Sequence, residues 1–219
     1  LSSSSAASDV YKRQVQNTAP AAWLLESAVA MALADCNAAL GRDHWPRACQ
    51  LYQQAIRNHQ SGDPLPIRAI EQLANLEVRR GGDNDDLGLI ETGLRRLRSL
   101  TDLMLSAPSG TLDAPAEQDP CEEQRCPAEW WSLIGSAEKR RAAVQARALT
   151  QTPNQEGLQT MLKAIQASIE AYDKVGADPY PLINKLSLKA VLAMPSSADP
   201  AVIRVITTLH DDLRRGFEQ

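Results

Sequence analysis

Apolar residues recur at three- and four-residue steps between positions 154 and 175, which is the pattern of an amphipathic helix. The apolar positions are Leu158, Met161, Leu162, Ile165, Ile169, Tyr172 and Val175. Beside them runs a strip of small residues that lets a second helix approach closely: Ala164, Ser168 and Ala171. The pattern breaks at Gly176 and the prolines after it and restarts at Leu182, so a second helix is predicted up to Met194. A single hairpin cannot bury its own apolar face, and the chain is therefore expected to stack several of them.

The same periodicity returns in six further segments, each preceded by a residue type that commonly starts a helix. These starts lie near Thr18, Asp43, Asp63, Asp85, Pro127 and Asp199. Eight helices in four antiparallel pairs are therefore predicted, which is an all-α fold. The second helices of the pairs begin near Asp43, Asp85, Gln155 and Asp199, at spacings of 42, 70 and 44 residues. The similar outer spacings indicate a repeat.

Two segments stand apart from the repeat. The first is residues 1–16, of which 1–14 (LSSSSAASDVYKRQ) resemble a translated sequencing adapter; the alternative is an ordinary Ser-rich, disordered terminus. If the adapter interpretation holds, the natural chain starts further upstream and this sequence is a fragment. The second is an insertion at 106–126, rich in proline and acidic residues, which is expected to be flexible. The helical repeat domain is predicted to span 17–219.

Composition narrows the class of protein. Hydrophobic residues make up 43% of the chain, enough for a core, whereas aromatic residues make up only 4%, which favours close helix packing over a β-sandwich. The net charge of −4 gives no general attraction to nucleic acid or anionic membrane, so neither is expected as a partner. No apolar run approaches the roughly 20 residues that span a bilayer, and no secretory signal is recognisable. A cytoplasmic protein is expected.

Neither a metal site nor a catalytic centre is predicted. Cys121 and Cys126 form a C-x4-C pair at the loose edge of zinc-binding spacings, and no second pair follows. Free thiols are favoured for them, with a disulfide as the alternative in an oxidising compartment. The sequence contains no G-x-x-x-x-G-K-[ST], H-E-x-x-H or G-x-S-x-G motif and no signature around any cysteine. We therefore expect no cofactor and no enzymatic activity.

Basic residues gather on the helix after Pro127: Lys139, Arg140, Arg141 and Arg147. Three ligands are possible for them, namely an acidic partner, a phosphate or the chain's own acidic insertion. The plainer alternative, which we favour, is a solvated helix face.

Aromatic and turn residues supply the other candidates for partner binding. Trp130 and Trp131 are adjacent, so one is expected in the core and the other on a groove or under the insertion. Tyr180 and Asn184 flank Pro181 and either lie on a concave face or, as favoured here, lock the turn. The full candidate set is Trp130, Trp131, Lys139, Arg140, Arg141, Tyr180 and Asn184.

Several motifs resemble those of tetratricopeptide repeats. Ala48, Tyr52 and Ala55 have the small–aromatic–small spacing of that repeat's second helix, and AYDKVGADP at 171–179 looks like its usual ending. Trp131, Ile134 and Gly135 have the spacing of its first helix, although Glu138 stands where an aromatic residue is expected. The phrases EQLANLEVRRG (71–81) and YPLINKL (180–186) are similar to divergent bacterial members. The resemblance covers roughly residues 43–194.

This resemblance implies a right-handed α-solenoid whose concave surface binds a peptide or a partner domain, as in a scaffold or adaptor. Divergent bacterial members include helical arrays attached to signalling or caspase-like effector domains. The resemblance therefore also implies an alternative, in which the chain is the regulatory arm of a larger enzyme or signalling protein whose catalytic domain lies upstream. A compact, nonrepeat helical bundle with an internal pocket is a third interpretation.

Overall fold

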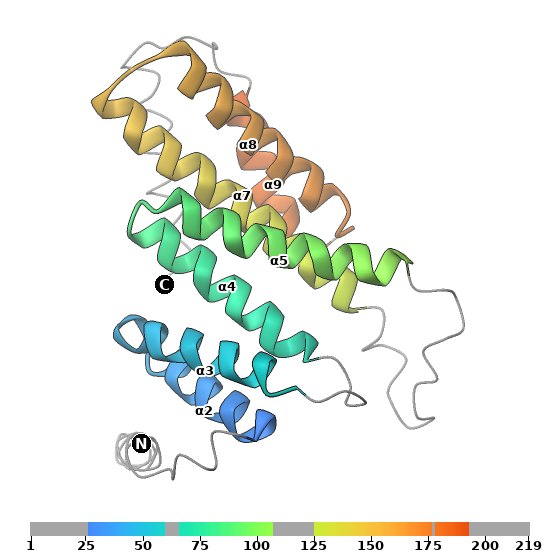
Figure 1. Ribbon diagram of the computed structural model, residues 1–219. Coiled ribbons are helices and arrows are strands. Elements are labelled where there is room, and N and C mark those ends of the chain that lie inside the picture. Colours follow the sequence, from blue (N-terminus) through green and yellow to red (C-terminus); the bar gives the residue numbers. More distant parts are fainter. Residues whose placement is uncertain (1–25, 60–65, 107–124, 177, 193–219) are drawn as a thin grey trace, which may run out of the picture. The chain divides into compact units, whose positions relative to one another are not determined.

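The computed structural model describes residues 26–59, 66–106, 125–176 and 178–192, and every element in these ranges is a helix (Figure 1). In chain order they are α2 (Ser27–Ala39), the 3-10 turn η2 (Arg42–His44), α3 (Trp45–Arg57), α4 (Ile67–Asp83), α5 (Leu87–Ser106), α7 (Arg125–Gln151), α8 (Gln155–Asp173) and α9 (Pro179–Leu192). The all-α prediction is confirmed. The chain divides into two compact units between Glu77 and Val78, within α4, and each unit is described by itself.

The first unit is an apolar core shared by α2, α3 and the start of α4. Ala48, Tyr52 and Ala55 of α3 are buried in it, as the small–aromatic–small spacing predicts. Ala69, Leu73 and Leu76 supply the contribution of α4. The Tyr52 hydroxyl donates a hydrogen bond to Asp35 Oδ1 over 2.5 Å, which gives the one polar atom of this buried ring a partner.

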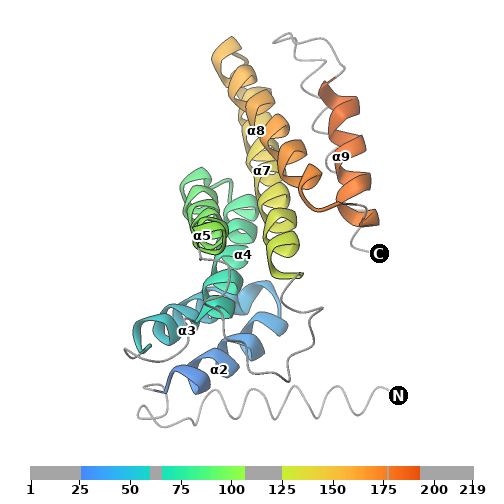
Figure 2. The ribbon, with the colours of Figure 1, turned by 90° about the vertical axis from the view of Figure 1, so that its right-hand side faces the viewer.

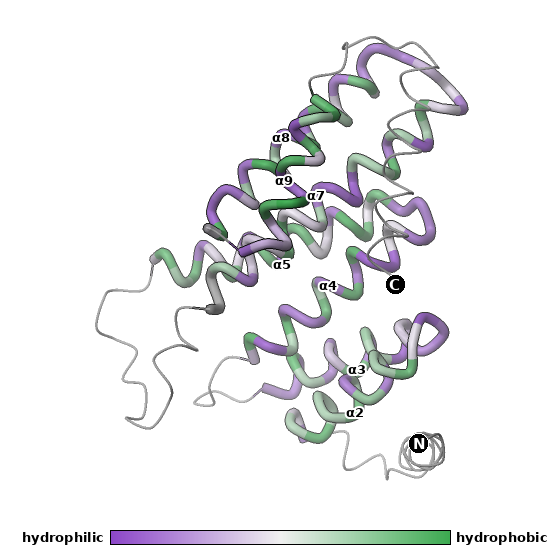
Figure 3. The backbone as a smooth tube through the Cα atoms, turned by 180° about the vertical axis from the view of Figure 1, so that it is seen from behind, coloured by the Kyte–Doolittle hydropathy of each residue, from purple (hydrophilic) through white to green (hydrophobic). Residues whose placement is uncertain are grey.

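The second unit is built around the hairpin of α7 and α8, with α9 packed against α8 (Figure 2). Its core contains Leu149 of α7, Met161 and Ile165 of α8, and Leu188 and Val191 of α9. Figure 3 shows hydrophobic and hydrophilic residues alternating along these helices, which is the periodicity read from the sequence. Asn154 caps α8, since its Oδ1 atom accepts a hydrogen bond from the Gly157 backbone amide over 2.6 Å.

A glycine sets how closely α7 and α8 approach. A Cβ atom placed on Gly135 would lie 2.7 Å from the Tyr172 ring, closer than packed atoms tolerate. The Ser168 hydroxyl also donates to the Gly135 carbonyl over 2.6 Å. Ser168 belongs to the small-residue strip beside the apolar face of α8. This strip therefore lies where α7 and α8 approach closely, as the sequence predicts.

Turns depart from the sequence interpretation at two places. His44 rather than Asp43 occupies the N-cap of α3, and both residues belong to the short 3-10 turn that precedes the helix. Gly81 and Gly82, of a residue type that often follows the end of a helix, lie inside α4, which continues to Asp83. The reversal follows at Asp85, the only described non-glycine residue with a positive φ, at 56°.

Some predictions fall outside the described residues: the tail at 1–16, the interior of the 106–126 insertion with Cys121, and the last helix from Asp199. Within the described ranges there are seven α-helices, compared with the eight expected for the whole chain. None of the described helices is both long and apolar enough to cross a membrane.

Candidate partner-binding site

The neighbouring basic residues of α7 point toward different helices, because consecutive residues of a helix point about 100° apart. Lys139 reaches α9, where its ammonium donates a hydrogen bond to Asn184 Oδ1 over 2.6 Å. Arg141 reaches α5, where it pairs with Glu91 at 3.2 Å. These two candidate residues therefore do not form a single basic face.

Lys139 belongs to a cluster of hydrogen-bonded side chains that joins α7, α8 and α9. We call it the polar cluster: Ser136, Lys139, Tyr172, Tyr180 and Asn184. The Ser136 hydroxyl lies 3.1 Å from the Tyr172 hydroxyl and 3.2 Å from that of Tyr180. The Asn184 amide also donates to the Tyr180 carbonyl over 2.8 Å, within α9. Asn184 is thus an internal anchor that fixes the Lys139 head group.

Two tyrosine rings belong to the polar cluster. The Tyr172 and Tyr180 rings meet edge to face, with 6.5 Å between their centroids. Tyr172 is buried, whereas 43% of Tyr180 is exposed. Burial raises the pKa of the Tyr172 phenol above its usual range, and the neighbouring Tyr180 contributes to the shift. The Tyr172 ring therefore stays a neutral hydrogen-bonding group, and Tyr180 is the ring that offers surface to a ligand.

The amino group of Lys139 is a cation in a place that disfavours charge. Burial and, to a smaller extent, the positive charge of Arg140 lower the pKa of Lys139 to about 8. An acceptor oxygen placed beside this group would offset the cost of burying its charge. The chemistry of the polar cluster suits recognition of a carbonyl or carboxylate oxygen next to an aromatic surface.

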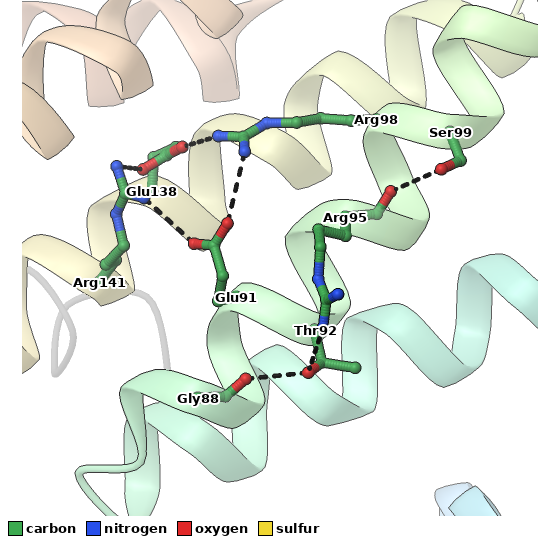
Figure 4. Close-up of polar contacts among 8 residues, drawn as sticks. All are labelled: Gly88, Glu91, Thr92, Arg95, Arg98, Ser99, Glu138 and Arg141. Atoms are coloured by element: carbon green, nitrogen blue, oxygen red, sulfur yellow. Dashed lines mark hydrogen bonds and ion pairs between the residues drawn. The ribbon is translucent and has the colours of Figure 1, made fainter.

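A second polar group, the charged seam, lies between α5 and α7 and consists of Glu91, Arg98, Glu138 and Arg141 (Figure 4). Glu138 is fully buried and pairs with Arg98 at 2.5 Å and with Arg141 at 2.7 Å. Glu91 joins the two arginines from the other side, at 3.7 Å from Arg98 and 3.2 Å from Arg141. Burial raises the pKa of the Glu138 carboxyl, and the charges of Arg141 and Arg98 offset part of that rise.

The other two basic candidates of α7, Arg140 and Arg147, lie against the turn between α4 and α5. Arg147 donates to Asp85 Oδ1 over 2.7 Å and to the Gly82 carbonyl over 2.8 Å, so it holds both sides of this turn. The aliphatic part of Arg140 packs beside Gly82. Three of the four basic residues, Lys139, Arg141 and Arg147, thus engage acceptors of the chain itself, an arrangement that differs from a solvated helix face.

The two tryptophans occupy different environments, as their adjacency predicts. Trp130 is 1% exposed and belongs to the core. Trp131 is half-buried, and the Lys174 ammonium lies 3.5 Å from the centroid of its ring. Trp131 and Tyr180 are therefore the partly exposed aromatic members of the candidate set.

The sequence interpretation did not include four residues that organise these sites. Ser136, Glu91 and Arg98 carry no motif, and only the structure brings them to the clusters. Glu138 did leave a signal, because it stands where the repeat pattern expects an aromatic residue. In the structure this glutamate is buried between two arginines, which accounts for the departure.

Metal-binding and thiol candidates are few in the described part of the chain. No group of three or more His, Cys, Asp and Glu side chains converges there. Of the cysteines whose side chains are described, Cys49 is buried and Cys36 is half-buried.

Comparison with protein families gives a match to Tetratricopeptide Repeats-Sensor over residues 44–189. This match spans well over half of the chain. It runs from the start of α3 into α9 and includes Trp131 and Gly135 of α7. The chain belongs to the Tetratricopeptide Repeats-Sensor family. Membership supports a helical repeat fold and a general role in protein interaction or sensing. Searches of curated proteins and of solved structures gave no match.

Proposed function

We propose that this member of the Tetratricopeptide Repeats-Sensor family binds a peptide or a partner domain along the face where α7 and α9 meet, and that it acts by binding rather than by catalysis. The observation that supports this proposal is the polar cluster. It places a desolvated lysine, held by Asn184 at 2.6 Å, next to the partly exposed ring of Tyr180.

The polar cluster is suited to binding because its parts are preorganised. Asn184 is 2% exposed, so the geometry of its contact with Lys139 is set before a ligand arrives. Prior ordering of side chains reduces the entropy that association costs. Aromatic residues at the edge of such a site supply contact area at low conformational cost, and Tyr180 and Trp131 are placed to do so.

Selection from a phage-displayed random peptide library tests the proposal, with the full chain as bait. Peptides that bind the natural sequence are expected to lose at least about tenfold in affinity for Lys139→Met. The matched control is Lys163→Met, which removes an exposed lysine of α8 and is expected to leave affinity unchanged. Circular dichroism verifies that both variants fold. Failure to select any binder, or equal affinity for Lys139→Met, would contradict the proposal.

The description of the family as a sensor supports a second candidate function. In it, the helical domain is the regulatory arm of a larger enzyme or signalling protein. The reading frame upstream of residue 1 discriminates the two: a catalytic domain encoded there favours the regulatory arm.

A further inference from the structure

The two glutamates of the charged seam are held unequally. Glu138 lies on the inner side, where its side chain is 1% exposed and its two oxygens lie 2.5 Å from Arg98 and 2.7 Å from Arg141. Glu91 lies on the outer side, where 44% of its side chain is exposed and its two oxygens lie 3.7 Å and 3.2 Å from the same two arginines (Figure 4). The arginine pair therefore binds one carboxylate tightly and a second one loosely.

The outer carboxylate can leave without displacing the arginines. An exposed ion pair gains little stability, because water solvates its charges well once they separate. Each guanidinium contacts Glu138 through one terminal nitrogen and Glu91 through the other. Glu138 thus keeps Arg98 and Arg141 in place when Glu91 turns away, and 43% of the Arg98 side chain is already exposed.

The charge and shape of this arginine pair favour a carboxylate as its outer ligand. Without Glu91, the two arginines and the ionised Glu138 leave one net positive charge. An Asp or Glu side chain supplies one negative charge and two oxygens, which two guanidinium groups can share as they share those of Glu91. A phosphate monoester carries about −1.5 to −2 charges at neutral pH and would leave negative charge uncompensated beside Glu138.

We propose that Arg98 and Arg141 bind an acidic side chain of a partner protein, and that Glu91 occupies their outer side in the unbound chain as an internal competitor. Binding exchanges one carboxylate for another, so the seam stays neutral and α5 and α7 stay paired. The site is independent of the polar cluster, since Lys139 reaches α9 whereas Arg141 reaches α5.

The internal competitor also sets which ligands can bind. Since Glu91 is tethered beside the arginines, its effective concentration there is high. A single free carboxylate therefore competes poorly, whereas an acidic segment that makes further contacts with the chain can displace Glu91.

Fluorescence anisotropy with a fluorescein-labelled hexaglutamate peptide tests the proposal on the full chain. Glu91→Gln removes the competing charge and keeps the size of the side chain, so it is expected to tighten peptide binding at least about fivefold relative to the natural protein. Glu170→Gln, at an exposed glutamate of α8, makes the same change in net charge and is the matched control. At physiological ionic strength the control is expected to stay within about twofold of the natural protein, because salt screens distant charges. Equal effects of the two substitutions, or no tightening in Glu91→Gln, would overturn the proposal.

Arg98→Lys, made together with Glu91→Gln, tests the arginine pair itself. The lysine keeps a positive charge beside the buried Glu138, and circular dichroism verifies that the double variant folds. One ammonium nitrogen cannot contact Glu138 and the outer carboxylate as two guanidinium nitrogens do, so peptide binding is expected to weaken at least about threefold relative to Glu91→Gln alone. Unchanged binding would overturn the proposal. A gain in affinity of Glu91→Gln for inorganic tripolyphosphate but not for hexaglutamate would assign the outer position to phosphate and would also overturn it.

Discussion

Helix α7 makes contacts of opposite chemistry with its two neighbours in the second unit. Toward α8 the contact is apolar and close, with Gly135 against the Tyr172 ring and Leu149 in the shared core. Toward α5 it is the charged seam, in which Glu138 is buried between Arg98 and Arg141. Apolar burial stabilises a fold directly, whereas a buried ion pair gains little net stability because desolvation opposes the Coulomb attraction.

This difference indicates a division of roles along one helix. The contact between α7 and α8, within one hairpin, stabilises the fold and is sensitive to the volume of the side chains that pack there. The contact between α7 and α5, which belong to successive hairpins, determines how the two helices pair and is sensitive to the charge of its side chains. Substitutions at these two contacts, ordered by the size of the expected effect on stability, separate the two roles.

The largest effect is expected at the apolar contact, from Gly135→Ala. The added methyl group would lie 2.7 Å from the Tyr172 ring, so one of the two helices must shift. Overpacking costs about 1–3 kcal/mol, and the better helix propensity of alanine returns up to about 1 kcal/mol, so a net loss of about 1–2 kcal/mol in the free energy of unfolding is expected. Urea denaturation followed by circular dichroism measures it.

Gly82→Ala is the matched control for this prediction. A Cβ atom there would meet the flexible Arg140 side chain at 3.4 Å, which is ordinary packing. The variant is expected to be neutral or slightly stabilised, because alanine favours a helix. Equal destabilisation at Gly135 and Gly82 would show that the close approach to Tyr172 has no particular role.

A smaller effect that depends on pH is expected at the charged seam, from Glu138→Gln. Burial raises the pKa of Glu138 in the folded protein above its value in the unfolded chain, so the folded state takes up a proton first as the pH falls. The natural protein should therefore gain stability relative to Glu138→Gln as the pH falls from 7 through the raised pKa toward the ordinary carboxyl value of about 4.3. Below that value the difference should stay constant.

Urea denaturation of both proteins across this pH range measures the difference. Glu91→Gln serves as the control, because 44% of the Glu91 side chain is exposed. A stability difference that moves in the opposite direction for Glu138→Gln would mean that the two arginines outweigh burial and hold the carboxyl pKa low.

The sequence predicted the helices well because helix formation follows local rules. Apolar spacing and the break at Gly176 placed α8 close to its observed bounds, whereas α9 begins at Pro179, three residues before the predicted restart at Leu182. Gly135 was identified from the sequence as part of a repeat motif, and its close packing against Tyr172 was found only in the structure. The adjacent tryptophans separated into a buried and a half-buried residue because consecutive residues of a helix point about 100° apart.

The polar sites were harder to predict because they depend on which helices meet. Lys139 and Asn184 were both candidates, but their direct contact joins positions 45 residues apart. Lys139, Arg140 and Arg141 suggested one basic face from composition, although the turn of the helix sends Lys139 and Arg141 to different neighbours. Glu138 was noticed as a departure from the motif, but its two arginine partners include Arg98 from another hairpin.

The central claim, that α7 uses charge toward α5 and apolar packing toward α8, is tested most directly by hydrogen exchange in Glu91→Arg. This reversal puts a positive charge beside Arg98 and Arg141 at a position whose exposure leaves the core intact. Mass spectrometry should show faster exchange than in the natural protein for residues 87–106 of α5 and unchanged exchange for residues 155–173 of α8. Equal acceleration in both helices, or none in either, would contradict the division of roles.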